Sequence, residues 1–286
     1  MLDTAHQTVE GKRVRVARLG HGSPLVLLHG YPDTLQIWSA LAPLLAETHS
    51  VIAFDWPGTG DSEAWSGGAS PMDLARRLLR LLDEWGIDRA VVVGHDMGGQ
   101  PALAAAAMEP SRIARVVVMN SLVIWNERTS WEIDLLRRFR INRFLLRHAP
   151  RVVFERAVRT SVSDLPDELR SELWRHFAKR ERREFIIRMC AGYEGTLPRL
   201  TVMYEQITAP LRIVWGSHDR HFPLAHGERL HALVPGSDLR VIEGGGHWMV
   251  WDRAEEVARE ISAAKTPDHA SRTVPAPSAQ RTAPPR

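Results

Sequence analysis

Short apolar runs alternate with helical stretches over the first 120 residues of the chain. Between these runs, residues 72–85 have the apolar spacing of a helix, and the alanine-rich residues 98–108 end before a proline at position 110. The apolar runs cover residues 14–19, 24–29, 50–54, 90–94 and 116–120. Strands that alternate with helices in this order predict a mostly parallel sheet crossed by helices, which is an α/β fold.

The pattern changes after residue 122. Residues 123–206 have helical spacing and no convincing strand, whereas strands resume at residues 211–215 and 239–242 and a closing helix follows. We therefore expect a core domain of residues 1–122 and 207–265, interrupted by a helical cap domain of residues 123–206. Residues 266–286 are rich in Pro, Ala, Ser and Thr, which predicts a disordered tail.

Composition limits the class of protein. The 286 residues are 44 % hydrophobic and 25 % charged, which is enough to bury a core and too polar for a membrane protein. No run of about 18 apolar residues is present, and the first 20 residues lack the apolar segment of a signal peptide. We expect a cytoplasmic protein with no membrane partner. The net charge of +3 is too small to predict a nucleic-acid partner.

Charge is distributed unevenly along the chain. Residues 123–200 contain 17 lysines and arginines against 11 aspartates and glutamates, so the helical insertion is more basic than the rest. One interpretation is a set of solvated helix faces, and the other is a surface that attracts an anionic substrate or partner.

Metal and disulfide chemistry have little support. Cys190 is the single cysteine, which excludes an intramolecular disulfide and a cysteine-based zinc site. His218 and His221 flank Asp219, but no third ligand is spaced to join them. We predict no metal.

The most informative segment is Gly94-His95-Asp96-Met97-Gly98, which follows an apolar strand and precedes a helix. A nucleophile at such a sharp strand-to-helix turn needs small residues two positions before and after it, because the backbone on both sides comes close. Asp96 is therefore the predicted nucleophile. His95 should point away from it, since neighbours on a strand face opposite sides.

Three further signals each follow a predicted strand. Residues 29–33, His-Gly-Tyr-Pro-Asp, form a loop that can supply a backbone N–H to an oxyanion hole, and residues 55–62 form a Gly-rich turn. Asp219 and His247 come late, giving the order nucleophile, acid, histidine.

With these motifs, residues 12–263 resemble the α/β-hydrolase superfamily, with the helical insertion where that family carries its cap. An aspartate at the elbow resembles the branch of epoxide hydrolases and of haloalkane and haloacetate dehalogenases. Esterases, lipases and peptidases carry serine there. The difference has a chemical basis, because a carboxylate that attacks an sp³ carbon forms an alkyl ester, which water can then hydrolyse.

The resemblance implies roles for the motif residues. Asp96 is the nucleophile, and His247, oriented by Asp219, activates water. The backbone N–H groups of Tyr31 and Met97 form the oxyanion hole. No cofactor is implied.

Leaving-group chemistry favours an epoxide over a carbon–halogen bond. A halide needs N–H donors, and the side chain of Met97, next to the nucleophile, donates nothing. An epoxide oxygen needs a proton, and Tyr193 lies late in the cap, where epoxide hydrolases place an acid tyrosine. The loop around Tyr31 also resembles the epoxide hydrolase version.

No tyrosine occurs early in the cap, so a second donor stays open. The candidates are Trp125, Trp131, His148, Trp174 and His176. Trp125 also keeps dehalogenation open, since an indole N–H can hold a halide. We expect Trp125, Trp248 and His29 to contact substrate.

The sequence thus predicts a cofactor-free epoxide hydrolase with a small-molecule substrate, bulky and aromatic in keeping with the ten tryptophans. Secondary metabolism fits such a substrate. A dehalogenase with the same triad is the alternative, and a catalytically silent binding protein on the same fold is a third hypothesis. The chain could also pair as a homodimer.

Overall fold

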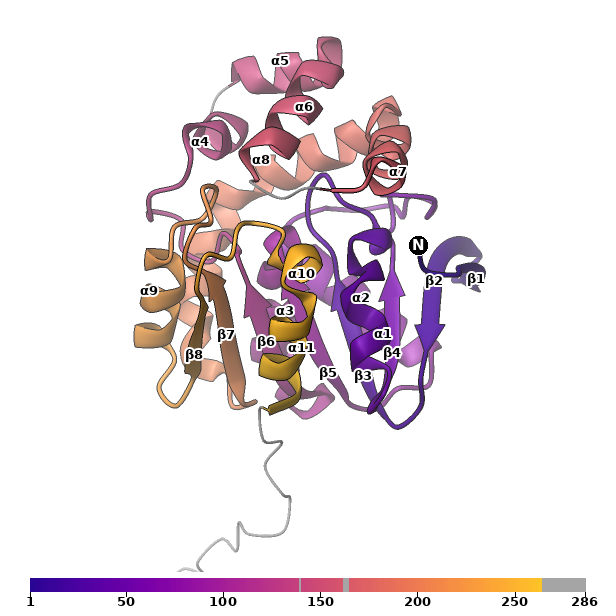
Figure 1. The fold of residues 1–286 in the computed structure, drawn as a ribbon, viewed down its shortest axis with the longest axis vertical. Helices are drawn as coiled ribbons and strands as arrows, with labels where there is room; N and C mark the ends of the chain where they lie inside the picture. Colours follow the sequence, from indigo (N-terminus) through magenta and orange to yellow (C-terminus); the bar gives the residue numbers. More distant parts are fainter. Residues whose placement is uncertain (139, 162–164, 264–286) are drawn as a thin grey trace, which may run out of the picture.

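A twisted sheet of eight strands forms the centre of the computed structural model, which describes residues 1–138, 140–161 and 165–263 (Figure 1). Its order is β1-β2-β4-β3-β5-β6-β7-β8, with β1–β2 and β2–β4 antiparallel and the other pairs parallel. The strands are β1 (Ala5–Val9), β2 (Lys12–Leu19), β3 (Ser23–Leu28), β4 (His49–Phe54), β5 (Ala90–His95), β6 (Ile113–Met119), β7 (Leu211–Gly216) and β8 (Asp238–Ile242). The predicted α/β class is confirmed.

The central strands are buried on both faces. Every residue of β5 and β7 is buried, which is why these strands appear in the sequence as mostly apolar runs, interrupted in β7 only by Arg212. The edge strand β1 was not predicted, because Ala5–Val9 is short, polar and mostly exposed. It pairs only with β2, through a hairpin that turns at Glu10 and Gly11, both at positive φ.

Helices cover both faces of the sheet. The core helices are α1 (Leu41–Leu45), α2 (Pro71–Glu84), α3 (Gly99–Met108), α9 (Ala225–Leu233), α10 (Met249–Asp252) and α11 (Ala254–Ala263). The chain moves from β3 to β4 in one direction along the sheet and from β5 to β6 in the other. Because crossovers between parallel strands are right-handed, α1 and α3 lie on opposite faces. The direction reverses between β3 and β5, and ligands bind at such a switch point in open α/β sheets.

Five further helices between β6 and β7 form the helical insertion, which lies above the carboxyl ends of the strands (Figure 1). They are α4 (Trp131–Arg138), α5 (Arg140–His148), α6 (Pro150–Thr160), α7 (Asp167–Phe177) and α8 (Arg180–Met203). The bounds predicted for core and cap stay a prediction, and the predicted tail lies outside the described residues. Within the described ranges, no helix is long and apolar enough to cross a membrane.

An ion cluster joins the insertion to the core. Arg15 on β2 donates to Glu172 on α7 at 2.7 Å and lies 3.5 Å from Asp55. His176, one turn after Glu172, lies 3.2 Å from the same glutamate and 3.5 Å from Asp61. Because these groups are largely buried, their pairing fixes α7 against the sheet more firmly than surface ion pairs would.

Replacing Glu172 by Gln should lower the free energy of unfolding at pH 7 by about 1.5–3 kcal/mol, the range for a hydrogen bond to a charged group. Burial opposes ionisation of Glu172, but hydrogen bonds from His176 and Arg15 outweigh it and hold its pKa below the ordinary value of 4.5. A depressed pKa means that the carboxylate stabilises the fold above pH 4.5, so the difference should shrink as the pH falls below that value. Urea titrations across this pH range measure it. Glu255→Gln, on the exposed side of α11, is the control and should change little.

Candidate active site

Asp96 lies at a sharp turn between β5 and α3. Its φ of +51° is a left-handed conformation that non-glycine residues seldom adopt outside functional sites. A Cβ at Gly94 would collide with the backbone of Gly98, and one at Gly98 would collide with the backbone of Leu28. Both glycines are therefore required by close packing, as the motif predicted.

The carboxylate of Asp96 has two distinct environments. Its Oδ1 accepts hydrogen bonds from the backbone N–H of Tyr31, at 2.9 Å, and from that of Met97. Its Oδ2 lies 3.5 Å from His247 Nε2. One oxygen thus sits where an oxyanion would be stabilised, and the other faces the histidine.

Asp219 holds the other side of the His247 ring. Its Oδ2 lies 2.9 Å from His247 Nδ1, and its Oδ1 accepts the backbone N–H groups of His221 and Phe222 at 2.7 and 3.1 Å. With both oxygens engaged, Asp219 fixes the orientation of the ring. The three residues predicted as a triad are therefore adjacent.

Charge within the triad is strongly coupled. Burial disfavours a charged imidazole, but the carboxylates of Asp219 and Asp96 outweigh it and raise the pKa of His247 to about 10. Burial likewise opposes ionisation of Asp96, yet His247 and the N–H of Tyr31 keep its pKa below the ordinary value. Both shifts favour an imidazolium between two carboxylates at neutral pH.

Asn120, at the end of β6, is a supporting residue that sequence reasoning missed. Its Nδ2 donates to the carbonyls of Gly246 and His247 at 2.9 and 3.0 Å, and its Oδ1 accepts the N–H of Gly216 at 2.9 Å. His95 Nε2 donates to the same His247 carbonyl at 2.8 Å. The available signal in the sequence was a polar amide residue directly after an apolar strand, which places Asn120 on the same sheet edge as Asp96.

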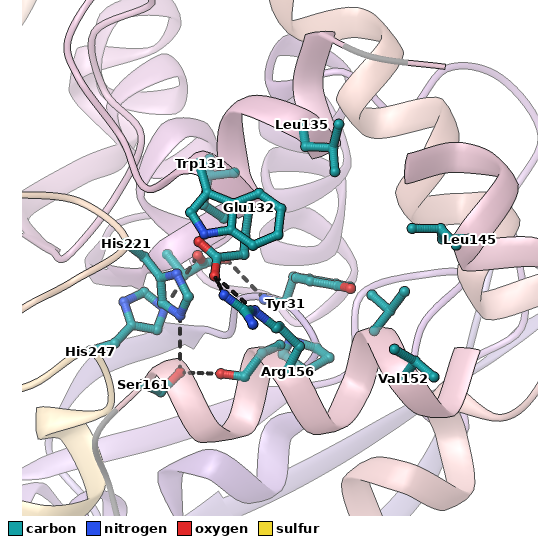
Figure 2. Close-up of a pocket in the computed structure, with 15 residues that line it drawn as sticks. Tyr31, Trp131, Glu132, Leu135, Leu145, Val152, Arg156, Ser161, His221 and His247 are labelled. Atoms are coloured by element: carbon teal, nitrogen blue, oxygen red, sulfur yellow. Dashed lines mark hydrogen bonds and ion pairs between the residues drawn. The ribbon is translucent and has the colours of Figure 1, made fainter. Parts of the chain in front are cut away.

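A cavity of about 170 Å³ separates the triad from the helical insertion (Figure 2). Asp96, His221 and His247 form its floor, and apolar side chains of α4, α5 and α6 form much of its wall. The polar wall residues from the insertion are Glu132, Arg156 and Ser161. The cavity therefore suits a mainly apolar molecule with its reactive carbon near Asp96.

Ser161, at the end of α6, joins the insertion to the triad. Its Oγ lies 3.2 Å from His221 Nε2 and donates to the carbonyl of Ala157, and its own carbonyl accepts the N–H of His247 at 3.4 Å. Figure 2 shows this contact below the two histidine rings. Neither Ser161 nor His221 was predicted to belong to the site, because each is polar in a loop or helix end without a motif.

Two tyrosines border a smaller cavity of about 20 Å³ beside Asp96. Tyr193 is buried there with its hydroxyl 3.6 Å from Met189 Sδ, and burial raises its pKa well above the usual value. Tyr31 also borders the main cavity, and its buried hydroxyl has no hydrogen-bond partner among the described residues. Tyr204, by contrast, donates to the carbonyl of Val123 at 2.6 Å and packs in the core.

Two of the expected substrate contacts need correction. His29 is fully buried, and its ring lies within hydrogen-bond distance of Gly30, Thr59 and Trp56, so it holds the loop before Tyr31 from behind. Trp248 is also fully buried, with its ring 6.3 Å from that of His247. Neither side chain lines the two cavities beside Asp96 described above, so both support the site from within the core.

The five residues that the sequence left open as a second proton donor lie in different parts of the structure. Trp125 is half-buried against the core, and Trp174 packs at a tilt against Phe154 and Phe177. His148 is exposed beside Phe144, and His176 belongs to the ion cluster with Glu172. Only Trp131 of these five borders the main cavity, among the lining residues described above. In the part of the chain described, no three His, Cys, Asp or Glu side chains are arranged to hold a metal ion.

Comparison with known proteins assigns the chain to a family. A model of the α/β hydrolase fold matches residues 23–254. The 2-hydroxy-6-oxononadienedioate/2-hydroxy-6-oxononatrienedioate hydrolase 2 of Pseudomonas putida is 31 % identical over 269 residues, which cover 85 % of this chain and 88 % of that protein.

Solved structures agree. An α/β hydrolase fold protein from Burkholderia ambifaria, 27 % identical, superposes with a TM-score of 0.79 over 92 % of this chain and 99 % of that one. A candidate epoxide hydrolase from Pseudomonas aeruginosa reaches 0.80 over 91 % and 94 %, but at 23 % identity this likeness concerns the fold alone. The chain belongs to the α/β hydrolase fold family.

Proposed function

We propose that this hydrolase opens an epoxide to a diol through a covalent ester on Asp96. The observation that carries the proposal is the divided environment of the Asp96 carboxylate. Oδ1 is held by two backbone N–H groups, while Oδ2 is directed to the cavity side, 3.5 Å from His247. Such a carboxylate can attack an sp³ carbon with one oxygen and keep the other stabilised throughout.

The first half-reaction forms the ester. Asp96 Oδ2 attacks a ring carbon, the carbon–oxygen bond of the epoxide breaks, and the released oxygen takes a proton from a tyrosine hydroxyl. Forming the ester removes the negative charge of Asp96, so the pKa of His247 falls. The imidazolium then gives up its proton, which restores the tyrosine.

The second half-reaction hydrolyses the ester. Neutral His247 takes a proton from water as the water oxygen attacks the carboxyl carbon of Asp96, and the N–H groups of Tyr31 and Met97 hold the oxyanion on Oδ1. Collapse expels the alkoxide, which takes the proton from His247 and leaves as the diol. The new carboxyl group returns its proton to His247, so the resting ion pair re-forms.

Two tyrosines are the acids in this proposal. Displacement at carbon is in line, so the donor must approach the epoxide oxygen from the side opposite the carboxylate. The backbone N–H of Tyr31 lies beside Asp96, and its ring extends into the cavity away from His247 (Figure 2). Its unpartnered hydroxyl, together with that of Tyr193 in the adjoining cavity, supplies the pair that the sequence left incomplete.

Hydrolysis of a carbon–carbon bond is a second candidate, favoured by the name of the Pseudomonas putida relative. The aspartate weighs against it, because a carboxylate that attacks a carbonyl carbon forms an anhydride instead of a stable ester. Asp96 would then have to assist water without covalent attachment, so a protein adduct separates the two reactions.

Dehalogenation with the same triad remains an alternative, and a silent binding protein is the third. Met97 offers no side-chain donor for a halide, and Trp125 packs against the core. We therefore rank dehalogenation, and with it the silent binding protein, below epoxide opening. We keep the cytoplasm as the proposed location.

Asp96→Ala should lower the pKa of His247 from its value of about 10 by about 1–3 pH units, because one of its two negative partners is lost. Titration of the imidazole signals by nuclear magnetic resonance measures this. Asp88→Ala, on the surface before β5, is the control and should leave the pKa unchanged. A His247 pKa that is the same with and without Asp96 would contradict the proposed ion pair.

His247→Gln should form the ester but fail to hydrolyse it, since no base is left to activate water. Incubation with styrene oxide should therefore add one substrate mass in intact-protein mass spectrometry. The matched double variant Asp96→Ala/His247→Gln should stay unmodified.

The substrate panel separates the alternatives. Diol release by the wild type supports epoxide opening, halide release from haloalkanes or haloacetate supports dehalogenation, and cleavage of a 2-hydroxy-6-oxo-dienoate without an adduct supports carbon–carbon hydrolysis. Turnover of none of these, with no adduct, leaves the binding protein.

Tyr31→Phe and Tyr193→Phe should each slow ester formation from an epoxide, and together by about 10²- to 10⁴-fold, the range for general acid catalysis. Hydrolysis of the ester should hardly change, because the backbone N–H of residue 31 is retained. Single-turnover kinetics resolve the two steps. Tyr204→Phe is the matched control, since its hydroxyl bonds a core carbonyl. Unchanged alkylation in both variants would remove the tyrosines from the mechanism.

A further inference from the structure

The outer faces of α5 and α6 have an unusual composition. Among the residues of these two helices whose exposure the structure describes, every exposed one is either basic or apolar. They are Arg140, Ile141, Phe144, Arg147, His148, Arg151, Val152 and Arg159. An ordinary solvated helix face mixes acidic, basic and neutral polar side chains. We call these eight residues together with Trp131 of α4 the outer face.

Large apolar side chains are concentrated there. Ile141 and Val152 are 62 % and 66 % exposed, and Trp131 and Phe144 are each 59 % exposed. In the described part of the chain, only Met1 and Val202 are further large apolar residues with such exposure. Figure 1 places α5 and α6 at the end of the molecule away from the sheet, so the core does not cover this face. Large exposed apolar side chains that gather on neighbouring helices, as here on α4, α5 and α6, mark an interaction surface.

The same surface is strongly basic. Residues 140–159 contain six arginines and a single acid, Glu155, which pairs with Arg151 and Arg170. Arg147 and Arg156 pair with Glu184 and Glu132 outside this segment. This short segment therefore carries a formal charge of +5, although the whole chain carries only +3. The basic bias that the sequence showed in the insertion is thus concentrated at its outer end.

We propose that the outer face docks on an anionic lipid surface. Arginines interleaved with Ile, Phe, Val and Trp match the interfacial region of a bilayer, where anionic headgroups meet acyl chains. A second copy of the chain is a poorer occupant, because a symmetric contact would bring two strongly basic faces together. A soluble anion would engage the arginines and leave the apolar side chains in water. The sequence led us to expect no membrane partner from the lack of a spanning segment, but peripheral docking requires none.

The catalytic cavity opens toward this face. Trp131 and Val152 are both exposed on it and both line the cavity above Asp96. Docking would therefore place the cavity mouth against the lipid, where an apolar substrate is concentrated. This consequence for the substrate rests on the proposed function, whereas the docking itself does not.

Co-sedimentation with vesicles tests the docking. Wild-type protein should bind vesicles of phosphatidylcholine mixed with phosphatidylglycerol, should not bind phosphatidylcholine alone, and should dissociate as salt is raised. The double variant Ile141→Ser/Phe144→Ser should bind at least about tenfold more weakly, and Arg140→Gln/Arg159→Gln by a similar factor. Val202→Ser, with an equally exposed side chain near the turn into β7, is the control and should bind like the wild type.

Three results would overturn the proposal. One is no binding of the wild type to the anionic vesicles at low salt, and another is equal binding by all variants. The third is a wild-type dimer in light scattering that Ile141→Ser/Phe144→Ser abolishes, because a second copy would then cover the face. Circular dichroism and melting temperature confirm that the variants fold. Vesicle binding needs no turnover, and the mass adduct on His247→Gln is measured without vesicles, so either proposal can fail alone.

Discussion

One backbone constraint sets the geometry of the site: Asp96 is held at positive φ where β5 turns into α3. The turn is stabilised by the buried strand before it and by Gly94 and Gly98, which let β5, α3 and β3 approach within contact. Because the adjacent loop after β3 lies at the switch point of the sheet, the N–H of Tyr31 reaches the same carboxylate oxygen as that of Met97. The proposed oxyanion hole is thus a consequence of strand order.

The rest of the triad depends on two further strand ends. Asp219 follows β7 and His247 follows β8, and both lie at the carboxyl edge because β5 to β8 run parallel. Asn120, at the end of β6 between β5 and β7, ties the ends of β7 and β8 together through three hydrogen bonds. Three neighbouring parallel strands, β6, β7 and β8, therefore position His247 and Asp219, the proposed base and acid, next to Asp96.

The sequence predicted most of this because glycine spacing and strand order are local signals. An apolar run ends at or shortly before each of Gly94, Asp96, Asp219 and His247. Their place at the carboxyl edge of the sheet could therefore be inferred without coordinates. The sequence-based prediction failed for residues whose role depends on whether the side chain is buried. His29 looked like a substrate contact because it precedes Tyr31, but its ring is enclosed by three partners. The polar strand β1 and the supporting residues Asn120 and Ser161 have no periodicity or motif, and only tertiary contacts identify them.

In the proposed mechanism, burial also explains how one histidine can serve both half-reactions. In the resting site the imidazolium of His247 offsets the cost of burying two carboxylates, which is why its pKa is raised and that of Asp96 is lowered. An ester on Asp96 removes one of those charges, and desolvation then favours the neutral ring. The group that stabilises the nucleophile before attack thus becomes a base only after attack has occurred. The order of the two steps is set by electrostatics within the triad, without any required movement of the chain.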